Sequence, residues 1–368
     1  MRMPARRRGA TLRLIARPLA PPTLPLSADA AAAAGSRVAL FHAAAVRHSE
    51  GVDYVARVEQ NLGTLLPLIA AGDRGGLERF ARSYLASAEE VLNARAASGM
   101  VIDGHGELRL GGPLSEAEGI LIVRRMTAGP RRIVDVADDL ALLLVDLADR
   151  TGTRAAGDAV MFGYVQAGGQ PQPDALLAFF GTYRAQAEAR AELVRAAEPG
   201  AEGAIARAHA GRLLTLSRRL AWRARGRLVL LVAGTSETDA SALAERLGVV
   251  SGIPVLSADA QVLNRADGIM DLADRVRAEG TAIVDAGGGD ARRQGALAAL
   301  LADGGATQPL LVESRVLPSN GDACEHLDAI AGVGAGDRLV VGAKAPLATQ
   351  VDDVEAWLDA LLAAGREG

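Results

Sequence analysis

The chain has 368 residues, enough for two or three domains, and its 49% hydrophobic and 23% charged content is typical of a folded globular protein. A net charge of −4 and an aromatic content of 3% argue against nucleic-acid binding, which needs a basic surface or stacking side chains. The one cysteine, Cys324, excludes an intramolecular disulfide and a multi-cysteine metal site, so we expect a cytoplasmic protein. The scarcity of aromatic residues predicts aliphatic cores.

Residues 1–27 form a basic, proline-rich stub with arginines but no acidic residue. Arg13 and Arg17 interrupt its apolar stretch, so it has neither the hydrophobic region of a signal peptide nor a membrane-spanning helix. Four prolines between Pro18 and Pro25 predict an extended, poorly ordered lead-in. We therefore expect no association with a membrane.

Residues 28–225 are predicted to be mainly helical, because apolar residues recur at spacings of three and four. The predicted helices span residues 28–47, 53–71, 77–98, 134–147 and 152–224, the last with breaks at Pro171, Pro173 and residues 198–200. Short extended segments are predicted at 100–110 and 119–123. Asp135 is expected to cap its helix, His42 to be a packed helix residue, and Gly35 to be a weak point in the first helix.

Arginines cluster at the end of this part of the chain: Arg212, Arg218, Arg219, Arg223 and Arg225. Because glutamates are interleaved with the arginines earlier in the segment, we interpret the cluster as a solvated helix face leading into a linker. We expect the domain boundary near Arg225 or Gly226.

Three motifs in this order resemble a known family. They are Phe41-His42-Ala43, then Asp103-Gly104-His105-Gly106-Glu107-Leu108, then Arg132 followed by Asp135-Val136-Ala137-Asp138-Asp139-Leu140-Ala141. The chain thus resembles aminoglycoside phosphotransferase-like kinases, specifically those fused to a C-terminal P-loop domain of the AAA or gluconate-kinase type. The resemblance runs from about residue 28 to the end and implies a kinase-like C-lobe over 28–225.

The resemblance also identifies departures from the family. Glu107 stands where the family has its catalytic aspartate, and His105 is expected to brace the same loop. The two metal ligands of the family fall on Gly112 and Val123, which cannot bind a metal through their side chains. The N-lobe, which carries the glycine-rich flap and the ATP-binding lysine, would precede residue 28, where only the stub is present. Phosphoryl transfer depends on positioning and charge neutralisation, so these losses imply an inactive kinase-like site.

The segment from Leu228 to Leu247 has the pattern of a buried strand, a polar loop and a helix. Its frame matches a P-loop at Gly234 and Ser241, but Asp239 and Ala240 replace the second glycine and the lysine, and Glu237 adds a carboxylate. A like-charge pair costs about 1 to 4 kcal/mol at 4 Å in wet surroundings, so we expect a P-loop scaffold without nucleotide binding. Lys344 is the only lysine in the chain.

Residues 226–368 alternate predicted strands and helices, which favours a parallel sheet with helices on both faces. The expected strands are 228–233, 255–256, 282–286, 310–314 and 339–341. One helix is expected after the first strand and its loop, ending at Leu247, and the others are expected at 271–279, 290–302, 322–330 and 352–364. Asp259 and Asp285 fall at the carboxyl ends of strands, where ligands bind. They are expected either to be metal ligands or to cap helices.

The sequence therefore predicts a mainly α kinase-like C-lobe followed by an α/β P-loop-type domain over 226–368. Our hypothesis is a pseudoenzyme: a pseudokinase-like binding or scaffold protein without a cofactor, acting with a protein partner or as a homodimer. The alternative is an ATP-dependent small-molecule phosphotransferase with residual or rerouted activity, using ATP and magnesium with Glu107 as base or Asp259 and Asp285 as metal ligands. A third possibility is a decaying gene product or a miscalled start.

Overall fold

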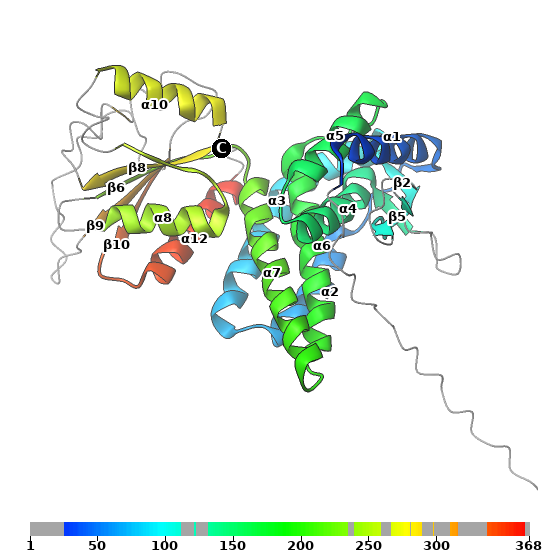
Figure 1. The fold of residues 1–368 in the computed structure, drawn as a ribbon, viewed down its shortest axis with the longest axis horizontal. Helices are drawn as coiled ribbons and strands as arrows, with labels where there is room; N and C mark the ends of the chain where they lie inside the picture. Colours follow the sequence, from blue (N-terminus) through cyan, green and yellow to red (C-terminus); the bar gives the residue numbers. More distant parts are fainter. Residues whose placement is uncertain are drawn as a thin grey trace, which may run out of the picture.

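The protein is described by a computed structural model over residues 26–111, 121–122, 132–234, 239–258, 266–279, 281–288, 297, 310–315 and 337–364. Figure 1 shows two units side by side, a helical unit from the first part of the chain and an α/β unit from the second. The expected order of a mainly helical part followed by an α/β part is confirmed.

Helices make up most of the first unit. They are α1 (Ala28–Ala44), α2 (Tyr54–Leu65), the 3-10 turn η1 (Leu66–Leu68), α3 (Ala71–Ala97), α4 (Val136–Thr151), α5 (Ala155–Gln166), α6 (Asp174–Arg195) and α7 (Ala201–Ala224). Side chains cap three of them as helix N-termini require: the oxygens of Ser27, Asp53 and Asp135 each accept a backbone N–H of the first turn. The predicted cap at Asp135 and the predicted breaks between α5, α6 and α7 are confirmed.

Short strands border the helices. β1 (Arg47–His48), β2 (Val101–Gly104) and β5 (Arg132–Asp135) form an antiparallel sheet in the order β1-β2-β5, and β3 (Leu110–Gly111) pairs with β4 (Leu121–Ile122). The loop after β2 carries His105 and Glu107, and β5 leads directly into α4. This small sheet thus fixes the loop against the start of α4.

Aromatic side chains fill one core of the helical unit, whereas the other described cores are mainly aliphatic, as expected. Tyr84 and Phe179 stack with ring centroids 4.3 Å apart, and Tyr54, Phe80 and Phe180 pack around them. Five of the aromatic residues of the chain therefore gather in one core, while Tyr164 and Trp222 belong to others. The overall composition could not reveal this, because it says nothing about where residues gather.

Helices α1 and α5 approach each other closely through two glycines. A Cβ atom built on Gly35 would lie 1.9 Å from the carbonyl oxygen of Val160, and one built on Gly163 would lie 1.9 Å from that of Ala32. Both separations are far below a van der Waals contact. Gly35 is therefore a packing requirement, and the interpretation of it as a weak point in the first helix missed this role.

The α/β unit has a parallel sheet, as predicted. Its strands are β6 (Val229–Gly234), β7 (Val255–Ser257), β8 (Ala282–Gly288), β9 (Leu310–Arg315) and β10 (Arg338–Gly342), in the order β10-β9-β6-β8-β7. In Figure 1, α10 (Ala266–Glu279) covers one face, and α8 (Ala240–Ser251) and α12 (Leu347–Ala363) cover the other. Of the helices predicted at 290–302 and 322–330, only Leu297 lies within the described residues, where it is helical.

The two units interlock through α7 and α12. Trp222 of α7 belongs to the apolar core of the α/β unit, while Leu362 of α12 packs against the core of the helical unit. Arg218 donates to Glu355 at 2.9 Å, and Arg225 donates to Asp359 at 2.6 Å. The predicted solvated arginine face is thus wrong at Arg218 and Arg225, because both side chains contact a helix that lies more than 120 residues later in the sequence.

Candidate functional site

The first candidate site is the edge of the large sheet where its strands end. β6 lies in the centre, with β8 on one side and β9 on the other, so the chain passes from one half of the sheet to the other around the end of β6. Ligands of open parallel sheets bind at such a switch point. Gly234 ends β6 there, and α8 begins nearby at Ala240.

A carboxylate of the chain itself caps the N-terminus of α8. The Oδ1 atom of Asp239 accepts the backbone N–H of Ala242 at 2.9 Å. In a P-loop, the backbone N–H groups at this position bind a phosphate, and a lysine neutralises it. Here Ala240 is buried in the apolar core, and Lys344 lies exposed between β10 and α12. The site therefore presents a negative charge where a triphosphate would need positive ones.

The side chains of Ser241 and Asp285 lie together. The Ser241 hydroxyl donates to the Oδ1 atom of Asp285 at 3.1 Å, and the backbone N–H of Gly287 donates to the same oxygen at 2.9 Å. In P-loop enzymes a serine or threonine and a strand-end aspartate hold magnesium. Ser241 and Asp285 have the side-chain types that suit magnesium. The Asp239 carboxylate and the alanine in the lysine position do not suit the nucleotide that the ion would accompany. Asp259 and Glu237 lie outside the described residues.

A further carboxylate at this sheet was not singled out from the sequence. Glu313 is fully buried on β9 beside Ala233, and its carboxylate accepts from Arg338 of β10 at 2.7 Å. The signal was the charged residue within the apolar run of that strand. The ion pair between Arg338 and Glu313 is internal to the sheet, so Arg338 does not supply a cation to the phosphate side of the site.

The second candidate site is the loop after β2, which carries the sequence-predicted residues His105 and Glu107. Asp139 on α4 accepts the backbone N–H of His105 at 2.7 Å and that of Gly106 at 2.6 Å. The ring of His42 adds a contact of 3.3 Å to the same carboxylate, and its other nitrogen lies 2.9 Å from the Tyr164 hydroxyl. His42 is thus a packed, hydrogen-bonded helix residue, as expected.

These contacts set the ionisation of Asp139. Burial alone would raise the pKa of its carboxyl group, but the hydrogen bonds from His42 and from the two backbone N–H groups lower the pKa below its usual range. Sequence reasoning quoted Asp139 within a motif and gave it no role. The feature of the sequence that could have indicated a role for Asp139 is that it is the second acidic residue in the first turn of an otherwise apolar helix.

The neighbouring carboxylate, Asp138, faces a different set of partners. Arg184 of α6 donates to it at 2.6 Å and also reaches the carbonyl oxygen of Gly106 at 3.4 Å. Burial lowers the pKa of the Arg184 guanidinium, but Asp138 raises it by more, whereas burial raises the pKa of the Asp138 carboxyl despite the nearby guanidinium. The loop is therefore held by α4 through backbone bonds and by α6 through an arginine.

The predicted residues on this loop contact each other locally. The backbone N–H of Glu107 donates to the Nδ1 atom of His105 at 3.3 Å. The side chain of Glu107 is exposed, as a base facing a substrate would be. Gly112 and Val123, the positions of the family's metal ligands, lie outside the described residues.

Within the described ranges, no three histidine, cysteine, aspartate or glutamate side chains gather in a way that could hold a metal ion. Among the helices that the structure describes, none is long and apolar enough to cross a membrane.

No family model matches the chain, and no solved structure matches it. The chain is similar to three uncharacterized mycobacterial proteins: Mb2027c of Mycobacterium bovis, and MT2060 and Rv2004c of Mycobacterium tuberculosis. Each is 30% identical to it over 184 residues. The alignment covers 50% of this chain and 36% of each relative. The names of these relatives state no activity, so the similarity transfers none.

Proposed function

We propose that the chain is a non-catalytic, pseudokinase-like binding or scaffold protein that does not use ATP. One observation carries this proposal: the Asp239 carboxylate caps α8 at 2.9 Å from Ala242 N, where a P-loop would receive phosphate. A nucleotide would have to displace this cap and then face its negative charge. With Ala240 in the lysine position, nothing at the described helix terminus compensates for that cost.

The loop in the helical unit supports the same proposal. Asp139, the carboxylate beneath the loop, accepts two backbone N–H groups and contacts His42, so it holds the loop in place. Asp138 is committed to Arg184. Of the carboxylates around this loop, these two serve structure, which leaves a stable surface for binding rather than an assembled phosphoryl-transfer site.

A protein partner or a homodimer is part of the proposal. Leu40 is 64% exposed and Val46 is 59% exposed, and Phe41 between them is also exposed, all near the end of α1. Exposed apolar side chains gathered in one place are typical of interaction sites. Sedimentation velocity over a range of concentrations tests this part, with Leu40→Ser and Val46→Ser as variants. A monomer at every concentration, with no captured partner that depends on these residues, would contradict it.

A second candidate, the phosphotransferase, is favoured by one specific contact. The hydrogen bond between Ser241 and Asp285 brings together the two side chains that hold magnesium in P-loop enzymes. Bonds of this kind also occur where a hydroxyl simply satisfies a strand-end carboxylate. The two functions make opposite predictions about nucleotide binding.

Thermal-shift and calorimetric titrations with ATP or GTP, each with magnesium, test the proposal. We expect no saturable, magnesium-dependent signal at nucleotide concentrations up to about 1 mM, which corresponds to a binding free energy weaker than about −4 kcal/mol. A saturable signal that disappears in Asp285→Asn, with the melting temperature unchanged, would overturn the proposal and support the phosphotransferase. Glu59→Gln, a carboxyl-to-amide change on an exposed ion pair, is the control.

A further inference from the structure

A cavity of about 1060 Å³ lies between the two units, away from both sites described above. Its walls come from α4, α5, α6 and α7 and from Gly252, Ile253, Pro254, Glu279 and Thr281 of the α/β unit. Pro254 precedes β7 and Thr281 precedes β8, so the cavity borders the amino ends of these strands, whereas the P-loop-like site lies at the carboxyl ends. Its volume is at the upper end of the range for small-molecule sites.

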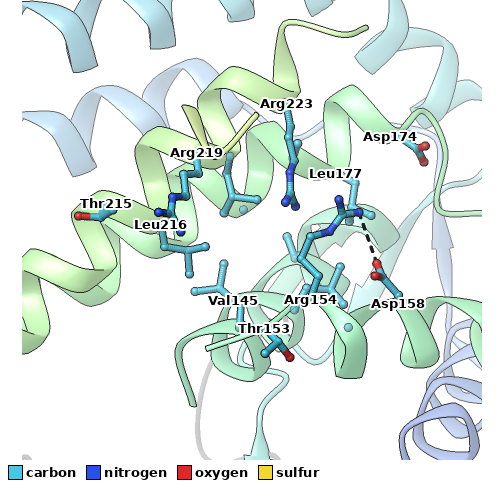
Figure 2. A pocket seen from close by; sticks show the side chains of 18 of the residues that line it. Val145, Thr153, Arg154, Asp158, Asp174, Leu177, Thr215, Leu216, Arg219 and Arg223 are labelled. Atoms are coloured by element: carbon cyan, nitrogen blue, oxygen red, sulfur yellow. Dashed lines mark hydrogen bonds and ion pairs between the residues drawn. The ribbon is translucent and has the colours of Figure 1, made fainter. Parts of the chain in front are cut away.

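Five arginines line this cavity, Arg154, Arg212, Arg219, Arg223 and Arg227, and three of them are labelled in Figure 2. Figure 2 shows Arg219 and Arg223 reaching down from α7 and Arg154 reaching up from the start of α5. Arg154 contacts Asp158 at 3.4 Å, and both of these side chains are exposed. In the part of the chain that the structure describes, the guanidinium groups of Arg219 and Arg223 make no hydrogen bond or ion pair.

The charges of these arginines are poorly compensated. Arg223 is an exposed residue, yet partial burial lowers its pKa most, and repulsion from Arg154 and Arg219 lowers it further, to about 10. Acidic residues also line the cavity, but Asp149 already bonds His209 at 2.6 Å and Asp158 bonds Arg154. Asp174 and Glu279 are the other two acids of the lining. An anion between the arginines would therefore relieve an existing repulsion.

The aliphatic part of the Arg219 side chain lies close to Gly252 of the α/β unit. Gly252 has a φ of +70°, and a Cβ atom built on it would lie 3.1 Å from the Cδ atom of Arg219. The side chain of Arg219 thus passes directly over the backbone of the α/β unit. This contact places the side chain of Arg219 at the junction of the two units.

The rest of the lining is largely apolar. Leu177 and Leu216 are labelled in Figure 2 beside the arginines. Further apolar side chains of the helical unit line the same space: Leu144, Val145, Met161 and Leu220. Such walls bind an apolar body, whereas guanidinium groups bind carboxylate or phosphate in a bidentate manner.

We propose that this cavity binds an amphipathic organic anion, with its carboxylate or phosphate group among Arg154, Arg219 and Arg223 and its apolar body against the leucines of α6 and α7. Because both units line the cavity, the bound anion also stabilises their junction. This site is independent of the proposed function: it can be occupied whether or not the chain binds a nucleotide.

Isothermal titration calorimetry of the full chain with four probes tests this proposal. The probes are decanoate, decyl phosphate, inorganic phosphate and decyltrimethylammonium, each kept below its micelle concentration. We expect saturable binding of decanoate, decyl phosphate or both, and the difference between them identifies the head group. Inorganic phosphate should bind more weakly than decyl phosphate, and the cationic probe should not bind. Equal binding of the cationic and anionic probes, or no binding of either decyl anion, would overturn the proposal.

Variants locate the site. The double substitution Arg219→Gln with Arg223→Gln should lower the affinity for whichever decyl anion binds more tightly by about tenfold or more, because two charge-assisted contacts are lost. Arg246→Gln on α8 removes the same charge from an exposed residue outside the cavity and should change the affinity less than about twofold. Without a ligand, the double variant should melt at or above the temperature of the wild type, because repulsion is removed. Unchanged affinity in a folded double variant would contradict the assignment.

Discussion

Arg225 of α7 and Asp359 of α12 form a buried ion pair that joins the two units, with the Nη2 and Oδ1 atoms 2.6 Å apart. Arg79 of α3 donates to the other oxygen of the same carboxylate at 3.2 Å. The Arg225 guanidinium also lies over the rings of Phe80 and Trp222. One carboxylate thus connects α3, α7 and α12.

Asp359→Ala should therefore destabilise the chain strongly. Removing one partner of a buried ion pair leaves the other charge without compensation, which typically costs about 3 to 5 kcal/mol. Asp352→Ala is the matched control, because Asp352 is exposed and its pair with Arg218 should contribute no more than about 1 kcal/mol. Urea unfolding measures both free energies. Equal effects of the two substitutions would contradict a structural role for the buried pair.

The carboxylate beneath the predicted catalytic loop should make stability depend on pH. The pKa of Asp139 is lowered in the folded chain, so its contribution is present above the unfolded pKa of about 4 and is lost as the pH falls through the folded value. Asp139→Asn should cost about 1.5 to 3 kcal/mol at pH 7, the range for hydrogen bonds to a charged group. The difference between variant and wild type should shrink on acidification. A difference that is constant from pH 7 to the acid limit of folding would show that Asp139 is not ionised.

The contact between α1 and α5 gives a test that depends on volume alone. Gly35→Ala places a methyl group 1.9 Å from Val160 O and should destabilise by about 1 to 3 kcal/mol, because the helices must separate. Gly63→Ala on α2 meets no atom within 4 Å and should be neutral or stabilising by up to about 1 kcal/mol. Thermal unfolding followed by circular dichroism measures both. Opposite signs are expected, and a neutral Gly35→Ala would mean that the two helices are not in this contact.

Nucleotide binding should be recoverable by restoring the P-loop residues. Asp239→Gly with Ala240→Lys removes the carboxylate and supplies the lysine, while Gly234, Ser241 and the helix N-terminus remain. Calorimetry with ATP and magnesium should then show binding that the wild type lacks. Adding Ser241→Ala should remove the magnesium dependence of this gain.

The same experiment has an informative negative outcome. Ala240 is buried, so the lysine must lead its stem out of the core, and the melting temperature of the double variant reports whether it does. Asp239→Gly alone should cost only a few tenths of a kcal/mol, as for other caps replaced by glycine. If the double variant is folded yet inert, the loop does not have phosphate-binding geometry.

Local sequence patterns predicted the elements of the fold well. The apolar run before Gly234 predicted β6, the periodic helices were found, and Asp135 caps α4. These features depend on residues within one or two turns of each other, so their physics is contained in a short window of sequence. The placement of Asp285 near the carboxyl end of a parallel strand was also predicted, but its contact with Ser241 was not.

Features that depend on distant contacts were not predicted. Gly35 is required by Val160, and Arg225 is neutralised by Asp359, in each case more than 120 residues away. The role of Asp139 depends on the backbone of a loop more than 30 residues earlier. A single sequence does not reveal which residues meet, so an arginine in an ion pair at a junction and one on a solvated face look the same.

The exchange of side chains between the units has a consequence for how the chain matures on the ribosome. Glu355 and Asp359 are translated after every other described element, yet they neutralise arginines on α7. Until α12 emerges, Arg225 faces Phe80 and Trp222 with no counter-charge, and Trp222 has no completed core to enter. Nascent chains arrested before residue 347 should therefore remain protease-sensitive at α7, and release of α12 should protect both units at once.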